Sequence, residues 1–247
     1  MVKSKWGQQM RHENSQINQA RNILDCILMD AQKTAETLAE EAVCLLSGSS
    51  AYKGDGIRLS DEHRQTLQGH IRKALLSNPL CNGAGFASYA ATQTNQGYWT
   101  LEWWRQEGKD IKQAQLEHNQ EARQSLDFRL FDWFEQPARH HRPFVDGPYV
   151  DYVCNGAYTI TAAHPVLIDD TFVGVAAVDV LVSTLERFIQ PALGAIGQPA
   201  LVINGDSRVV TSAMSGVRPG SLWKGKDRSR ISSSEGNALY LVVLATT

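Results

Sequence analysis

Two aspartates at the ends of apolar, strand-like runs are the residues best suited to bind a ligand. Asp151 lies in the run that begins at Tyr149, and Asp179 ends the run 173–178. A carboxylate in such a setting is costly unless a cation or hydrogen bonds meet it. Two carboxylates that share one cavity also repel each other unless a cation lies between them. The pair therefore predicts a cation site.

Aromatic side chains can complete such a site. Trp133 and Phe134 are adjacent, and strand alternation places Tyr149 on the same face as Asp151. Aromatic ring faces attract cations, so carboxylates and rings together are the chemistry of an ammonium site. Each residue also has a simpler interpretation. The aromatic pair would serve as hydrophobic core, Asp151 as a turn carboxylate, and Asp179 as a helix cap.

The sequence lacks the motifs that mark metal, cofactor and nucleophile sites. His140 and His141 are adjacent rather than four residues apart, and the Gly-Ala-Gly at 83–85 lacks the third glycine of a dinucleotide loop. The four cysteines form no C-x-x-C pair, and no G-x-S-x-G or phosphate-binding loop occurs. We therefore predict no metal and no cofactor. An enzyme that uses Asp151 and Asp179 as acid and base is the alternative.

The composition is that of a folded protein without strong charge bias. Hydrophobic residues make up 43% of the chain, and 24 Lys and Arg residues against 26 Asp and Glu residues give a formal net charge of -2. Such a chain can bury a core, and it lacks the charge balance of most nucleic-acid-binding proteins. Because no run of about 18 apolar residues occurs, the sequence predicts no transmembrane helix.

Hydrophobic periodicity predicts an α+β fold with a long N-terminal helix over 9–46. Its apolar stripe suits either a partner helix, as in a homodimer, or packing on its own domain, and both can hold at different ends. Asn155-Gly156 between two apolar runs indicates a hairpin. Further helices are expected at 60–76, 109–127 and 184–190, and strands at 83–90, 98–106, 149–154, 157–163, 172–180, 200–204, 208–212 and 238–245.

Four ordered segments between residues 128 and 189 resemble the Cache family of bacterial sensor domains, also called PDC domains. They are Asp-Trp-Phe-Glu at 132–135, Gly-Pro-Tyr-Val-Asp at 147–151, Tyr-Thr-Ile-Thr at 158–161 followed by Pro165 and Val166, and Phe-Val-Gly-Val-Ala-Ala-Val-Asp at 172–179. The resemblance implies a sensor domain in signal transduction that binds a ligand without converting it. It also implies the ligand-binding residues Trp133, Phe134, Tyr149, Asp151 and Asp179.

The same resemblance divides the chain into three parts. They are a long N-terminal helix (1–50), a PAS-like ligand-binding sensor domain (51–190) and a small C-terminal second sheet (191–247). The last part is small for a unit with its own core, so it should lean on the sensor domain.

Departures from the family pattern indicate the kind of ligand. Cache domains that bind amino acids usually carry an Arg two residues before the Trp and a Tyr five residues before that Arg, to hold the carboxylate. Here these positions are Phe131 and Leu126, and Arg129 stands in a different register. The sequence therefore favours a small cationic amine, such as a polyamine, ethanolamine, choline or an aromatic amine. The alternative is an amino acid or a small carboxylate held by Arg129 or another cation.

Partners and compartment are expectations from the family. The chain shows no kinase, cyclase, DNA-binding or methyl-accepting segment, so the signalling output should be fused elsewhere or separate. A homodimer through the N-terminal helix is expected, and a dimerisation module with a vestigial pocket is a further alternative. The initiating Met1 and the unpaired thiols favour a soluble cytoplasmic relative. The alternative is a periplasmic sensor region excised from a membrane receptor.

Overall fold

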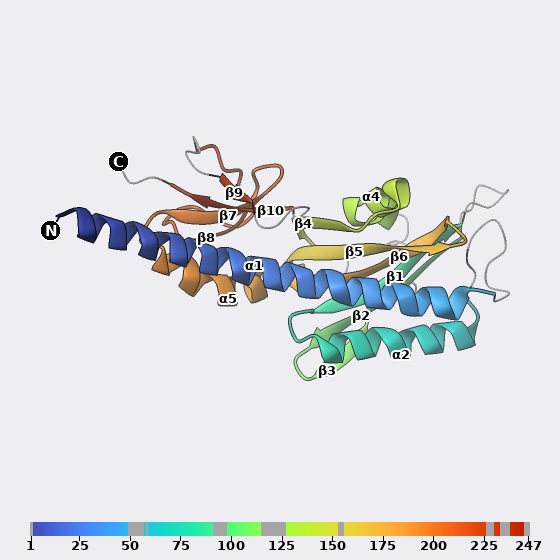
Figure 1. Cartoon of the computed structure of the whole chain (residues 1–247). Coiled ribbons are helices and arrows are strands. Elements are labelled where there is room, and N and C mark those ends of the chain that lie inside the picture. The colour runs from blue at the N-terminus through green and yellow to red at the C-terminus, as the bar shows by residue number, and fades with distance from the viewer. Residues whose placement is uncertain are drawn as a thin grey trace.

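A computed structural model describes residues 2–48, 57, 59–90, 98–114, 127–152, 156–225, 230–232 and 238–244. The fold is α+β, as predicted. Helix α1 (Val2–Leu46) runs along two antiparallel sheets (Figure 1). The other elements are α2 (Asp61–Ser77), β1 (Gly83–Ala90), β2 (Tyr98–Glu107), β3 (Asp110–Gln113), η2 (Phe128–Leu130), α4 (Asp132–His140), β4 (Phe144–Val150), β5 (Tyr158–Ile168), β6 (Thr171–Leu181), α5 (Val182–Ala195), β7 (Ala200–Asn204), β8 (Val209–Ser212), β9 (Arg230–Ser232) and β10 (Leu239–Val243).

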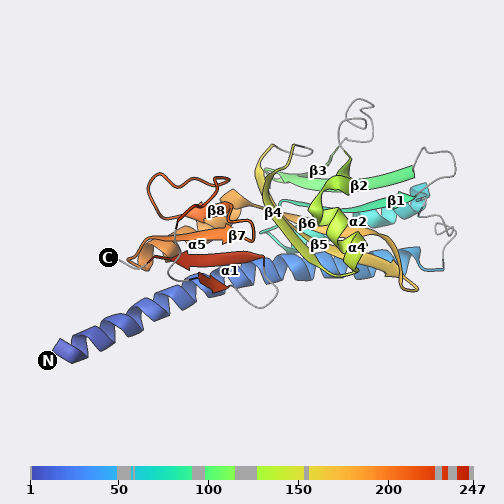
Figure 2. The ribbon, with the colours of Figure 1, turned by 90° about the horizontal axis from the view of Figure 1, so that it is seen from above.

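The larger sheet has six strands in the order β3-β2-β1-β6-β5-β4. Strand β6 is central and pairs antiparallel with β1 and β5, so Asp179 stands opposite Gly83 on one side and Thr161 on the other. Alternation along β6 turns Val178 and Val180 toward the core under α1, whereas Ala177 belongs to the aromatic cluster on the other face. Asp179 shares the face of Ala177, which is the face that α4 covers (Figure 2).

The smaller sheet has four strands in the order β8-β7-β10-β9, and α5 connects it to β6. The two sheets meet where β7 ends, because the Asn204 side-chain amide donates a hydrogen bond of 2.9 Å to the Gly147 carbonyl. Gly147 lies in a bulge of β4 between Asp146 and Tyr149. The second sheet therefore touches the strand that leads to Tyr149 and Asp151. The three-part division of the chain remains a prediction.

The apolar stripe of α1 packs against its own subunit. Leu24 and Leu38 are 0% exposed and Ala31 is 2% exposed, in one core with the inner faces of the larger sheet and α5. This burial counts against a dimer seam along that stretch of the stripe. Pairing through the part of α1 before Ala20 remains a prediction. Among the described helices, none is long and apolar enough to cross a membrane.

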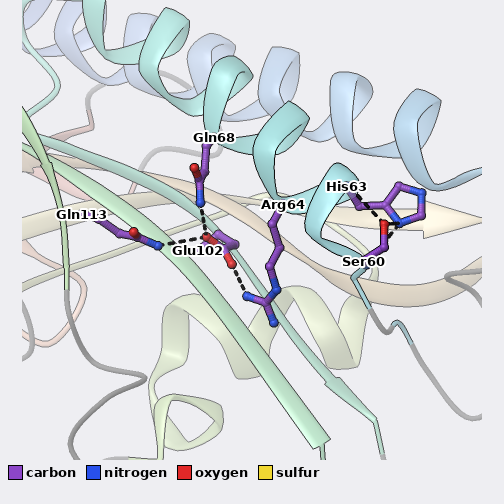
Figure 3. A network of polar contacts seen from close by, with 6 residues as sticks. All are labelled: Ser60, His63, Arg64, Gln68, Glu102 and Gln113. Atoms are coloured by element: carbon purple, nitrogen blue, oxygen red, sulfur yellow. Dashed lines mark hydrogen bonds and ion pairs between the residues drawn. The ribbon is translucent and has the colours of Figure 1, made fainter.

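Helix α2 is fixed at its start and along its inner face. Ser60 caps the helix by accepting a hydrogen bond from the His63 backbone amide at 3.2 Å. Further along, Arg64 forms an ion pair with Glu102 of β2, whose side chain is 1% exposed. Figure 3 shows Gln68 and Gln113 donating to the same carboxylate. This network holds α2 against one face of β2 and leaves the neighbouring residue, Trp103, on the other.

Three local predictions differ from the structure. The helix expected over 109–127 is wrong at its start, because strand β3 lies there, and residues 115–126 lie outside the described part. The strand expected at 149–154 runs instead from Phe144 to Val150, and Asn155 of the expected hairpin also lies outside the described residues. Helix α4 is absent from the sequence-based expectation, since it is short and contains Pro137.

Candidate ligand-binding site

A chain of hydroxyl groups leads to the buried carboxylate of Asp179. This side chain is 2% exposed, and its Oδ1 accepts a hydrogen bond of 2.6 Å from the Thr161 hydroxyl. Thr161 in turn lies 2.6 Å from the Tyr149 hydroxyl. Because the single Thr161 proton is used toward Asp179, the Tyr149 hydroxyl donates to Thr161. Strand pairing places these residues side by side, since β5 lies between β4 and β6.

Asp151 is the second buried carboxylate and is 5% exposed. It follows β4 directly, where its backbone amide donates to the Ala157 carbonyl at 2.9 Å and its carbonyl accepts from the Gly156 amide at 2.7 Å. These bonds fix its backbone at the start of the turn. The charge of Asp151 acts on Asp179, so the two carboxylates lie in one electrostatic neighbourhood, and their joint contact with a ligand stays a prediction.

Burial and mutual repulsion perturb the acids of this neighbourhood. Burial, and after it the negative charge of Asp151, raises the pKa of Asp179 to about 8, against a smaller lowering by the Thr161 hydrogen bond. The same two causes, burial and a nearby carboxylate, here that of Asp179, raise the pKa of Tyr149 well above its ordinary value. Without a cation the site therefore holds Asp179 in its neutral form near pH 7.

The predicted aromatic residues lie on the α4 side of the sheet. Trp133 and Phe134 are 7% and 5% exposed and meet edge to face at 6.0 Å between ring centroids. Trp133 also lies 5.8 Å from Trp103, whereas Phe134 packs edge-on against Phe128 and Phe172. Trp133 is thus linked to the Asp179 side of the cluster through Trp103. Phe134 has the contacts of a core residue, and its contact with a ligand remains a prediction.

A carboxylate from β4 holds α4 in position. Phe131, the residue before the helix, makes no side-chain cap, but Asp146 accepts a hydrogen bond of 3.2 Å from the Trp133 backbone amide. Burial, with a smaller contribution from Asp132, raises the pKa of Asp146 to about 6. Asp146 therefore positions Trp133 from a distant part of the chain.

The residues expected to distinguish an amine from an amino acid are also placed. Phe131 stacks on Tyr149 with ring centroids 6.2 Å apart and 22° between the planes. Arg129 donates to Asp127 through Nε at 2.7 Å and through a second guanidinium nitrogen. Leu126 lies outside the described residues. Phe131 thus covers Tyr149 with an apolar ring, and Arg129 is engaged by a neighbouring acid.

Trp103 and Thr161 lie beside the predicted site residues. The sequence gives Thr161 no role, and it indicates that the aromatic residues Trp99, Trp103 and Trp104 are sheet core, of which one could line the pocket. Trp103 is 5% exposed and joins the same aromatic cluster, and its indole nitrogen approaches the position of Gly83 next to Asp179. Gly83 and Gly85 are the sequence feature that could have pointed to Trp103, because glycine in a strand often marks the close approach of another group. Within the described ranges, no group of three or more His, Cys, Asp or Glu residues is placed to hold a metal ion.

The family match of the sequence and the structural neighbours of the fold point to the same kind of domain. Residues 67–187 match the family described as the first PDC sensor domain of methyl-accepting chemotaxis protein-like proteins. This part of the chain is similar to a PDC sensor domain. No curated protein sequence matches the chain significantly.

Solved structures similar to this chain are sensory domains. "Methyl-accepting Chemotaxis protein X" has a TM-score of 0.65 at 12% identity, over 94% of both chains. The ligand-binding domain of the Campylobacter jejuni chemoreceptor Tlp3 in complex with L-valine has a TM-score of 0.62 at 11% identity, over 98% of this chain and 94% of that one. The extracellular domain of the putative histidine kinase soHK1S-Z6 has a TM-score of 0.57 at 14% identity, over 80% and 68%.

The matched family and the similar structures are sensory domains of chemoreceptors and histidine kinases, not catalytic enzymes. Sensor domains of this kind bind small molecules and are linked to signalling output domains. This agrees with the prediction of a binding module without catalysis. The structures at this level of identity establish the fold, and the ligand has to be argued from the site.

Proposed function

We propose that this sensor domain recognises its ligand through an ammonium group, which binds between Asp179 and Asp151. The observation that carries the proposal is the pair of almost fully buried carboxylates, 2% and 5% exposed, of which Asp151 raises the pKa of Asp179. A buried carboxylate next to a second one is unfavourable in the free protein. A ligand cation would offset the repulsion and the burial of charge that otherwise keep Asp179 protonated.

The surroundings support an ammonium group rather than a bare ion. Tyr149 orients Asp179 through Thr161, at 2.6 Å for each contact, and leaves Asp179 Oδ2 available to a ligand donor. Trp133 and Tyr149 supply apolar ring surface beside the carboxylates, which suits the carbon atoms of an organic cation. An ammonium group has three donors, so it can bind both aspartates at once.

An amino acid is the first candidate ligand. The sensory domain of the Campylobacter jejuni chemoreceptor Tlp3 has been solved with isoleucine, L-valine and L-norvaline bound, and it covers almost the whole of this chain. These ligands share the α-ammonium group that the two aspartates would bind. The neighbours thus support the amino acid, which the sequence placed second.

A cationic amine without a carboxylate is the second candidate. Phe131 stands at the position where amino-acid-binding relatives usually have an Arg, and it stacks on Tyr149. Arg129 is engaged by Asp127. Both observations weaken recognition of a carboxylate by these two residues, and they favour polyamines, ethanolamine, choline-like cations or aromatic amines.

Binding to single-residue variants tests the proposal. Thermal shift and titration calorimetry would compare amino acids, amines and dicarboxylates on the wild type, Asp151→Ala, Asp179→Ala and, as a matched control, the exposed Asp110→Ala. A charge-assisted hydrogen bond contributes about 1.5–3 kcal/mol, so loss of either buried aspartate should weaken binding roughly 10- to 150-fold. Asp110→Ala should bind like the wild type. Wild-type affinity in both buried-aspartate variants, or a response to dicarboxylates alone, would refute the ammonium site.

A further inference from the structure

The indole ring of Trp103 lies flat over strand β1 because β1 carries glycine beneath it. Gly85 is the register partner of Trp103, and a Cβ atom at Gly85 would lie 2.8 Å from Trp103 Cδ2 and closer still to Cε3. A side chain at position 85 would therefore displace the ring. The alternation of β1 places Gly83 on the same face, one step further along the strand.

Gly83 lies next to both the Asp179 carboxylate and the Trp103 indole nitrogen. A Cβ atom at Gly83 would lie 2.8 Å from Asp179 Oδ2 and 3.1 Å from Trp103 Nε1. The carboxylate oxygen and the indole nitrogen are thus no farther apart than these two distances together. One is a hydrogen-bond acceptor and the other can only donate. A ligand that reaches both atoms meets an acceptor and a donor at once.

The indole N–H of Trp103 is a buried donor left for a ligand. Trp103 is 5% exposed, and its Nε1 has no hydrogen-bond partner among the described residues. A buried donor without a partner is unfavourable, so its retention calls for an explanation. The hydrogen bond of Asp179 described above uses Oδ1, which leaves Oδ2 on the side of Trp103.

We propose that Trp103 Nε1 donates a hydrogen bond to a ligand oxygen on the carbon chain next to the ammonium group. This inference rests on the proposed ammonium site and narrows its ligand. Asp179 accepts from the ammonium, and Trp103 donates to the neighbouring oxygen. Because the two protein atoms both lie beside Gly83 and are close together, the ligand must carry its donor and acceptor close together. The site then selects 2-amino alcohols and α-amino acids over simple alkyl amines.

Trp104 provides a matched control on the same strand. Its Nε1 is likewise buried without a partner among the described residues, but its ring packs toward α1 and α2, where the Arg72 guanidinium lies 5.2 Å from the ring centroid. An unpartnered indole alone therefore does not make a site. What distinguishes Trp103 is the adjacent carboxylate of Asp179, with Gly83 next to both groups.

Calorimetry with Trp103→Phe and Trp104→Phe separates the two roles. The probes are isobutylamine, L-valinol and L-valine, with ethylamine, ethanolamine and glycine as a smaller series. A neutral hydrogen bond contributes about 0.5–1.5 kcal/mol and one to a charged group about 1.5–3, so Trp103→Phe should weaken amino alcohols roughly 2- to 12-fold and amino acids roughly 10- to 150-fold. Alkyl amines should bind Trp103→Phe unchanged, and all ligands should bind Trp104→Phe unchanged. The size of the loss distinguishes a hydroxyl from a carboxylate.

The outcomes distinguish this inference from the proposed function. If Trp103→Phe weakens the alkyl amine as much as the amino alcohol, the indole acts on Asp179 rather than on the ligand, and the inference is refuted while the ammonium site stands. If no probe binds the wild type, or binding ignores Asp179→Ala, the ammonium site fails and the inference with it. Should Trp103→Phe fail to fold, the wild-type indole N–H resonance decides. It must shift with L-valinol and not with isobutylamine, and equal shifts would refute the inference.

Discussion

Asp179 should make the free protein less stable as the pH rises. Burial and Asp151 raise the pKa of Asp179 from 3.8 to about 8 in the folded state. The folded state therefore holds a proton that the unfolded state releases. Below about pH 4 this group costs nothing, and stability is lost between pH 4 and 8 as the unfolded carboxylate ionises. Above pH 8 both states are ionised and the loss is complete.

The slope of this loss has a definite magnitude. One proton difference changes the free energy of unfolding by about 1.4 kcal/mol per pH unit, which accumulates to on the order of 5 kcal/mol across the window. Asp179→Asn cannot titrate and keeps an oxygen for the Thr161 hydroxyl. Urea unfolding of the ligand-free protein between pH 5 and 7.5 should therefore show the stability of Asp179→Asn gaining on the wild type by about 1.4 kcal/mol per pH unit.

A control removes general effects of charge. The exposed Asp110→Asn should follow the wild-type pH dependence, because the Asp110 side chain meets water. Subtracting the free energies of unfolding of wild type and variant at each pH cancels the contribution of all other titrating groups. Parallel pH profiles for the wild type and Asp179→Asn would show that Asp179 is ionised in the free protein, which would contradict the electrostatic account of the site.

Three further predictions concern the framework around the site. Leu38→Ala should lower the free energy of unfolding by about 2–5 kcal/mol in urea, because the α1 stripe is core, and a loss under 1 kcal/mol would contradict this. Arg64→Met should cost about 3–5 kcal/mol at pH 7, because it removes the positive charge that pairs with the buried Glu102 carboxylate, and thermal melting unchanged from the wild type would argue otherwise. Gly85→Ala should lower the free energy of unfolding by about 1–3 kcal/mol, because the new methyl group would press against the Trp103 indole. Gly69 of α2 has open space around it, so Gly69→Ala should raise the free energy of unfolding by about 0.5–1 kcal/mol. Equal effects of the two glycine changes would refute the packing argument.

The fold and the acidic pair of the site could be predicted because their signals are local. Asp151 and Asp179 stand out as charges in apolar runs, and strand alternation assigns them a face without any structure. The order of helices and hairpins likewise indicated an antiparallel sheet. The structure confirms the fold and brings the two carboxylates together.

The remaining features depend on contacts between distant segments. Trp103 becomes part of the site only because Gly85 of β1 lies beneath it, and the sequence shows the two glycines without showing what covers them. Helix α4 begins where Asp146 of a later strand accepts from its backbone, so no local capping pattern announces it. The spacing of the apolar residues in α1 suits packing against a partner helix, but the same spacing also suits a helix that packs on the sheet of its own subunit.

Proton release on binding tests the central claim most directly. With a pKa of about 8, Asp179 is neutral in roughly nine of ten free molecules at pH 7. An ammonium ligand needs the carboxylate, so it must displace this proton. Calorimetric titrations at pH 7, with a ligand from the amine and amino-acid panel in buffers of different ionisation enthalpy, should show close to one proton released per ligand bound by the wild type. Asp179→Asn should release none. Tight wild-type binding without proton release would contradict the ammonium site at Asp179.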